Sequence, residues 1–148
     1  MKINIIDEYN TVIYLNKSII KFIDFSNVEN ELDKIFLKLK NTYNISISGY
    51  YDVDIYCDDN YGVVIKLTQS DIDSFDYLDK IISMNINTYN KEFLYKLDDI
   101  YDDLKSFIYY KSNIYTNNYN DIRISEHASI IYDDLIDKIN NEGLKIIL

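Results

Sequence analysis

The residues best able to do chemistry in this chain are its aspartates, which gather in three clusters. Closely spaced carboxylates are the usual ligands of Ca²⁺ and Mg²⁺. An EF-hand loop also needs glycine at its sixth position, where Cys57 and Asp76 stand in the first two clusters, so neither is an EF-hand. The clusters are Asp52, Asp54, Asp58 and Asp59; Asp71, Asp73, Asp76 and Asp79; and Asp98, Asp99, Asp102 and Asp103.

The third cluster has the spacing of a helical face. On a helix, Asp98 would lie one turn from Asp102, and Asp99 one turn from Asp103. Such pairs can hold Mg²⁺, but phosphoryl chemistry also needs basic residues or backbone amides for the phosphate, and none is evident nearby. A solvated acidic face or a protein-docking face is the stronger interpretation. A small metal-dependent enzyme is the alternative from a different class.

The sequence offers no other catalytic set. His127 is the only histidine, and a dyad with Cys57, the only cysteine, would require two distant segments to meet. The glycines Gly49, Gly62 and Gly143 are too isolated to form a phosphate-binding loop. We therefore expect a protein that is not an enzyme, with no catalytic residue, no cofactor and no bound metal.

Composition narrows the class of partner. The 148 residues carry a formal net charge of −10 and contain 16 tyrosines, no proline and one arginine, Arg123. Nucleic-acid binding depends on Lys and Arg, so this charge argues against it. It favours solubility or a protein partner with a basic surface. The excess of Ile, Asn, Lys and Tyr is typical of AT-rich codons. One cysteine and no apolar leader or membrane span predict a cytoplasmic location.

Tyrosine next to aspartate is typical of a protein-binding surface, because tyrosine is enriched at interfaces. Two segments of the chain have this pattern, and both are candidates for partner binding. The candidate residues are Tyr50, Tyr51, Asp58, Asp59 and Tyr61 in the first segment, and Asp98, Asp99, Tyr101, Asp102 and Asp103 in the second.

The first half of the chain predicts strands around one helix. Val28, Leu32 and Phe36 have helical spacing, and Ser26 and Glu29 have the spacing of a capping box, so a helix is expected over 27–40. The expected strands are Lys2–Ile6, Thr11–Leu15, Ile19–Asp24, Tyr43–Tyr50, Asp52–Cys57 and Val63–Leu67, with a hairpin loop over 58–62.

The second half of the chain also predicts hairpins that alternate with helices. We expect a hairpin of 81–87 with 92–96, then a helix through Leu97, Ile100, Leu104 and Phe107 or Ile108. A hairpin of 113–116 with 121–124 follows. A last helix is expected through Ala128, Ile131, Leu135 and Ile139, capped by Ser125 and ended by a left-handed Gly143, before a strand over 144–148.

These elements predict an α+β fold of antiparallel hairpins alternating with about three helices. Two similar small lobes, 1–70 and 80–148, are the expected domains, and one compact domain is the alternative. The polar stretch 68–78 is the expected boundary between the lobes.

Several short segments match the order of residues in one known family. They are 1–8, Thr11-Val12, 45–49, 61–65, Thr68-Gln69, 93–104 and 142–147. In these segments the chain resembles MecA-type adaptor proteins of Gram-positive bacteria. The resemblance implies an N-domain that holds substrate and a C-domain that contacts the Clp unfoldase, with the third aspartate cluster as a docking face. The long acidic linker of that family is absent.

The sequence thus favours a non-enzymatic, acidic adaptor or regulator that binds a partner protein. The alternative is a stoichiometric inhibitor of a nucleic-acid enzyme, such as a phage anti-defence or anti-CRISPR protein or a toxin-immunity protein. Acidity and small size suit both, because an acidic surface can compete with nucleic acid for a basic groove.

Overall fold

The computed structural model describes residues 1–17, 27–45, 49–69, 82–118, 124 and 128–148. The chain divides into two units, each with its own sheet. The first unit is Met1–Ile55 with Val63–Tyr89, and the second is Tyr56–Gly62 with Asn90–Leu148. The predicted strand at 19–24, the Ser26 cap, most of the boundary stretch 68–78 and the partner strand at 121–124 fall wholly or largely outside the described residues.

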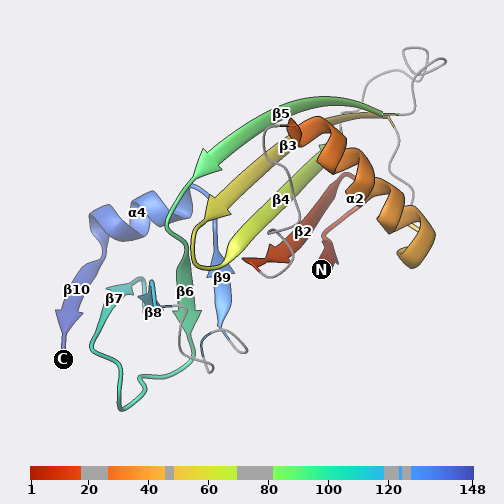
Figure 1. Cartoon of the computed structure of the whole chain (residues 1–148). Coiled ribbons are helices and arrows are strands. Elements are labelled where there is room, and N and C mark those ends of the chain that lie inside the picture. The colour runs from red at the N-terminus through yellow and green to blue at the C-terminus, as the bar shows by residue number, and fades with distance from the viewer. Residues whose placement is uncertain (18–26, 46–48, 70–81, 119–123, 125–127) are drawn as a thin grey trace. The chain divides into compact units, whose positions relative to one another are not determined.

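The first unit holds a five-stranded sheet in the order β1-β2-β4-β3-β5 (Figure 1). Its strands are β1 (Lys2–Ile5), β2 (Asn10–Asn16), β3 (Gly49–Asp58), β4 (Gly62–Gln69) and β5 (Ile82–Asn90). The predicted hairpin of β1 and β2 is confirmed as an antiparallel pair. The Asp7 carboxylate stabilises its turn by accepting the N–H groups of Tyr9 and Asn10 at 2.8 and 2.9 Å.

The strands β3 and β5 are neighbours in this sheet and are joined by side-chain hydrogen bonds. The Asn85 amide donates to Asp52 at 3.3 Å, and the Asn87 amide donates to Asp54 at 3.4 Å. Both pairs are offset by 33 residues, which is the constant offset of strands that run in the same direction. For the second half of the chain, the sequence predicts a hairpin of 81–87 with 92–96. This prediction is wrong, because β5 belongs to the first sheet and 92–96 does not.

The helix α2 (Val28–Tyr43) covers one face of the first sheet (Figure 1). Leu32, Phe36 and Leu39 are buried at helical spacing, which confirms the helix predicted over 27–40. The helix ends where Asn44 adopts a left-handed conformation with φ 55°. The strand predicted from Tyr43 is therefore wrong at its start, because Tyr43 belongs to α2 and β3 begins at Gly49.

The second unit holds a second five-stranded sheet in the order β10-β7-β8-β6-β9. Its recorded strand pairs are all antiparallel. The strands β7 and β8 form a hairpin through Lys111 and Ser112, which have φ values of 45° and 64°. The strands are β6 (Leu94–Leu97), β7 (Ser106–Tyr110), β8 (Asn113–Thr116), β9 (Ser129–Ile131) and β10 (Leu144–Ile147).

Two predicted helices differ from the structure. No helix follows Leu97: a loop leads to β7, in which Phe107 and Tyr110 are buried as strand residues. The last helix, α4, spans only Leu135–Glu142, because Ser129–Ile131 pairs with β6 as β9. The α+β class is confirmed, with two helices in place of about three among the described residues.

Candidate functional site

The buried carboxylate of Asp58 organises the hairpin loop between β3 and β4. Its Oδ1 accepts the N–H groups of Asn60 and Tyr61, each at 2.7 Å, and its Oδ2 accepts the N–H of Phe93 at 2.7 Å. The Tyr61 ring packs against Phe93 with centroids 5.8 Å apart. Asp58 therefore ties its loop to the residue that precedes β6, and its oxygens are occupied within the fold.

The tyrosines of the first candidate segment lie mostly inside the molecule. Tyr51 and Tyr61 are buried, and Tyr50 is half-buried. Asp59 is the one member of this segment that is exposed. The structure thus separates the five residues that the sequence grouped: three are buried, and Asp59 remains available to a partner.

Asp59 borders a cavity of about 550 Å³ that Cys57, Asn90 and Lys91 also line. Burial and the charge of Asp59 together raise the pKa of the half-buried Cys57 thiol. A raised pKa lowers the thiolate fraction at neutral pH, and the thiolate is the nucleophile. The cavity therefore has no activated cysteine.

Lys91 is held at the same cavity by two carboxylates. Its ammonium donates to Asp134 at 3.2 Å and to Asp137 at 3.1 Å. Burial lowers the pKa of Lys91, but the hydrogen bonds and charges of the two aspartates outweigh that effect, so the pKa lies above its usual value. Lys91 is therefore a protonated cation that connects the segment before β6 to α4 and to the residue before it.

The second candidate segment forms an acidic loop, which we define as Asp98–Asp103. The sequence predicted a helix here, and the structure has an irregular loop between β6 and β7 instead. The loop is anchored by the buried Leu104, whose N–H donates to the Tyr101 carbonyl at 3.0 Å. Because there is no helix, the premise that paired aspartates share a helical face is wrong.

The carboxylates of the acidic loop face solvent. Asp98, Asp99, Asp102 and Asp103 are all exposed, and Tyr101 is half-buried. Asp99 accepts the N–H of Ile100 at 2.8 Å, which stabilises the local backbone. The loop is therefore the one place where the structure brings several of the predicted binding residues together on a surface.

The acidic loop adjoins an exposed apolar strand. The N–H of Leu148, directly after β10, donates to the carbonyl of Lys105 at 2.8 Å. On β10 and its end, Leu144, Ile147 and Leu148 are 63, 87 and 64% exposed. The sequence predicts the strand but not its exposure, because apolar strand residues are usually expected in a protein core.

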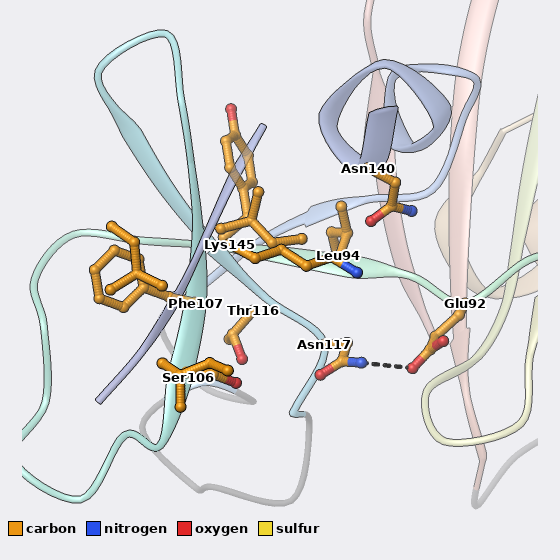
Figure 2. A pocket seen from close by; sticks show the side chains of 12 residues that line it. Glu92, Leu94, Ser106, Phe107, Thr116, Asn117, Asn140 and Lys145 are labelled. Carbon is orange, nitrogen blue, oxygen red and sulfur yellow. Dashed lines mark hydrogen bonds between the residues drawn. The ribbon is translucent and has the colours of Figure 1, made fainter. Parts of the chain in front are cut away.

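A cavity of about 480 Å³ lies next to β10 in the second unit (Figure 2). Its lining includes Leu94, Tyr115 and Lys145, which the strand pairing places on one face of the sheet, and Phe107, which it places on the other. At the same cavity the Asn117 amide donates to Glu92 at 2.7 Å (Figure 2). A cavity lined by both apolar and polar side chains suits an inserted side chain.

In the described part of the chain, no group of three or more His, Cys, Asp or Glu residues is placed to hold a metal ion. His127 lies outside the described residues. Over those same residues, neither helix is long and apolar enough to cross a membrane. Searches of protein-family models, of curated proteins and of solved structures find no match to this chain.

Proposed function

We propose that this protein is a non-enzymatic adaptor or regulator that binds a partner protein through its second unit. The observation that carries the proposal is the acidic loop, whose exposed aspartates stand beside the exposed apolar residues of β10. An apolar patch rimmed by charge is typical of a protein interface, where the charges set specificity and association rate.

The partner's surface is basic. The chain has 25 acidic and 15 basic residues, and its acidic loop contains no Lys or Arg. A lysine- or arginine-rich surface would complement these carboxylates and exclude acidic competitors. The sequence resemblance to MecA-type adaptors suggests the Clp unfoldase as one form of such a partner.

A second function, inhibition by competition with nucleic acid, is favoured by the carboxylates of Asp52 and Asp54. Both lie on one face of β3, and the amides of Asn85 and Asn87 hold them in place. Fixed negative charges along a strand could occupy a basic nucleic-acid groove. For this function, the double variant D52N/D54N weakens binding to the target enzyme; unchanged binding contradicts it.

Affinity purification from the native host, with defined variants as bait, tests the main proposal. The variant D98N/D99N/D102N removes three charges from the loop, and Asn still accepts the Ile100 N–H. The control E8Q/E29Q/D33N removes three exposed charges from the first unit. The loop variant loses a partner that the wild type and the control retain. Equal capture by all three baits contradicts the proposal.

A further inference from the structure

Among the strands that the structure describes, β10 pairs with β7 alone, so one side of its backbone has no neighbouring strand. It stands at the end of the order β10-β7-β8-β6-β9. Edge strands are commonly protected by charges, by proline or by bulges. Here Lys145 is the single charged residue of β10, and three apolar side chains stand exposed around it.

The pairing with β7 determines which backbone groups face outward. In an antiparallel pair, hydrogen-bonded and non-hydrogen-bonded residues alternate. The Leu148 N–H bonds to Lys105, so Ile146 and Leu144 also direct their N–H and C=O groups toward β7. Lys145 and Ile147 therefore direct theirs away from the sheet. The Gly143 N–H, which bonds to Ile139 within α4's last turn, fits the same alternation.

The charges near the free side of β10 indicate which kind of strand could pair with it. A strand that extends along β10 toward Leu148 reaches the acidic loop, since Leu148 is bonded to Lys105 at the end of that loop. A second copy of this chain is disfavoured. If β10 paired antiparallel with its own copy, the acidic loop of each copy would approach Glu142 of the other, next to the start of β10.

We propose that β10 accepts an extended segment of the partner as a sixth strand of the second sheet. Apolar residues on one face of that segment cover Leu144 and Leu148, those on its other face cover Ile147, and its lysines or arginines contact the acidic loop. Backbone hydrogen bonds would supply affinity, and side chains the specificity, as in other cases of strand addition. This inference rests on the proposed function and names its mode of binding.

Ile147 provides a sharp test, because its N–H faces away from β7. Ile147→Pro removes that donor and places a ring at the edge, while the ladder with β7 keeps its bonds. Ile147→Ala is the matched control, since it loses the side chain but keeps the N–H. Thermal unfolding of both variants confirms that they fold.

The probe is a short synthetic peptide of alternating valine and threonine with lysines at one end. A second peptide carries glutamates there instead. Fluorescence anisotropy measures both against the wild type. We expect Ile147→Pro to weaken the lysine peptide roughly tenfold or more relative to Ile147→Ala, the loss of about one hydrogen bond and its edge contacts. We expect D98N/D99N/D102N to remove most of the preference for lysine over glutamate.

Strand addition is contradicted if the lysine peptide binds Ile147→Pro as tightly as Ile147→Ala, or if neither peptide binds the wild type. Equal binding of the two peptides to the wild type contradicts the selection of a basic segment by the acidic loop. A dimer seen by sedimentation that Ile147→Pro dissolves would assign the edge to a second copy. If the captured partner is lost by the loop variant but kept by Ile147→Pro, strand addition fails while the proposed function stands. If neither change affects capture, both fail.

Discussion

At the scale of single residues, Asp58 shows how an apparent surface carboxylate can belong to the fold. Its oxygens accept three backbone N–H groups, two in its own loop and one from Phe93. Asp58→Ala would leave the N–H groups of Tyr61 and Phe93 buried without a partner, at a cost of about 1–3 kcal/mol for each unsatisfied group, whereas Asn60 is exposed to water. We therefore expect Asp58→Ala to lower the free energy of unfolding by about 3 kcal/mol or more, measured by urea denaturation.

Asp59 supplies the control for that experiment. It is adjacent in sequence but exposed, so we expect Asp59→Ala to change the free energy of unfolding by no more than about 0.5 kcal/mol. If the two substitutions cost the same, the three hydrogen bonds of Asp58 do not stabilise the loop.

Asp59 also supports a prediction about pH, through its effect on Cys57. Burial, followed by the negative charge of Asp59, raises the pKa of Cys57, so the thiolate forms at higher pH than in an ordinary cysteine. Alkylation by iodoacetamide follows the thiolate and should show a midpoint above that of a model thiol. Asp59→Asn removes the repulsive charge and should shift the midpoint downward. A midpoint that does not move would exclude the charge of Asp59 as a cause.

At the scale of elements, the junction of α4 and β10 depends on Gly143. The sequence predicted a left-handed helix cap here, but φ is −72°, a value open to any residue. The glycine is required for space instead. A Cβ at this position would overlap the Ile108 side chain and the Ile139 carbonyl. We expect Gly143→Ala to destabilise the protein by about 1–3 kcal/mol, as overpacking does.

Thermal unfolding measures this cost against Asn141→Ala, an exposed change in the same helix end. Asn141→Ala should be nearly neutral, because alanine favours a helix and no contact is lost. Destabilisation by the control alone, or by neither variant, would contradict the close approach of α4 to β7.

The elements also show what the sequence could predict. The helix α2 was found because Leu32, Phe36 and Leu39 are apolar at helical spacing and polar residues fill the opposite face. Hairpins with short turns, such as 58–62, were found from residues that favour turns. In these cases a local pattern determines the structure, because one face of the helix or strand is buried and the other is exposed to solvent.

The errors have a common physical cause. Leu97, Leu104 and Phe107 are all buried, so their spacing imitates a helix, yet they lie on β6, in a loop and on β7. Pairing between distant strands decided their conformation, and single-sequence periodicity does not contain that information. Strand β5 shows the same limit, since its partner is β3 rather than the next strand along the chain.

The candidate site also has features that local sequence predicts and features that depend on contacts between distant segments. Exposed aspartates of the acidic loop could be named from the sequence, because a run of charges seldom enters a core. The burial of Asp58 and Tyr61 could not, since it depends on Phe93, which is distant in the sequence. Exposure of β10 depends on its place at the sheet edge, which only the topology reveals.

At the scale of the whole molecule, the net charge of −10 acts on stability as well as on binding. Like charges held in a compact state repel one another, and salt screens that repulsion over about 10 Å at 0.1 M. Screening also weakens the ion pairs of Lys91 with Asp134 and Asp137 and of Lys34 with Glu31, but among the described residues these are few against the excess of carboxylates. We therefore expect the thermal midpoint to rise when NaCl increases from about 10 to 200 mM.

The loop variant separates this effect from binding. D98N/D99N/D102N removes three negative charges, which changes the net charge from −10 to −7. Because the repulsion is smaller, its midpoint at low salt should equal or exceed that of the wild type, and its midpoint should rise less with salt. A variant that is at least as stable yet loses the partner has lost a contact and not its fold. A midpoint that falls with salt would contradict the repulsion on which this argument depends, and partner loss would then need a test of folding before it could be assigned to the loop.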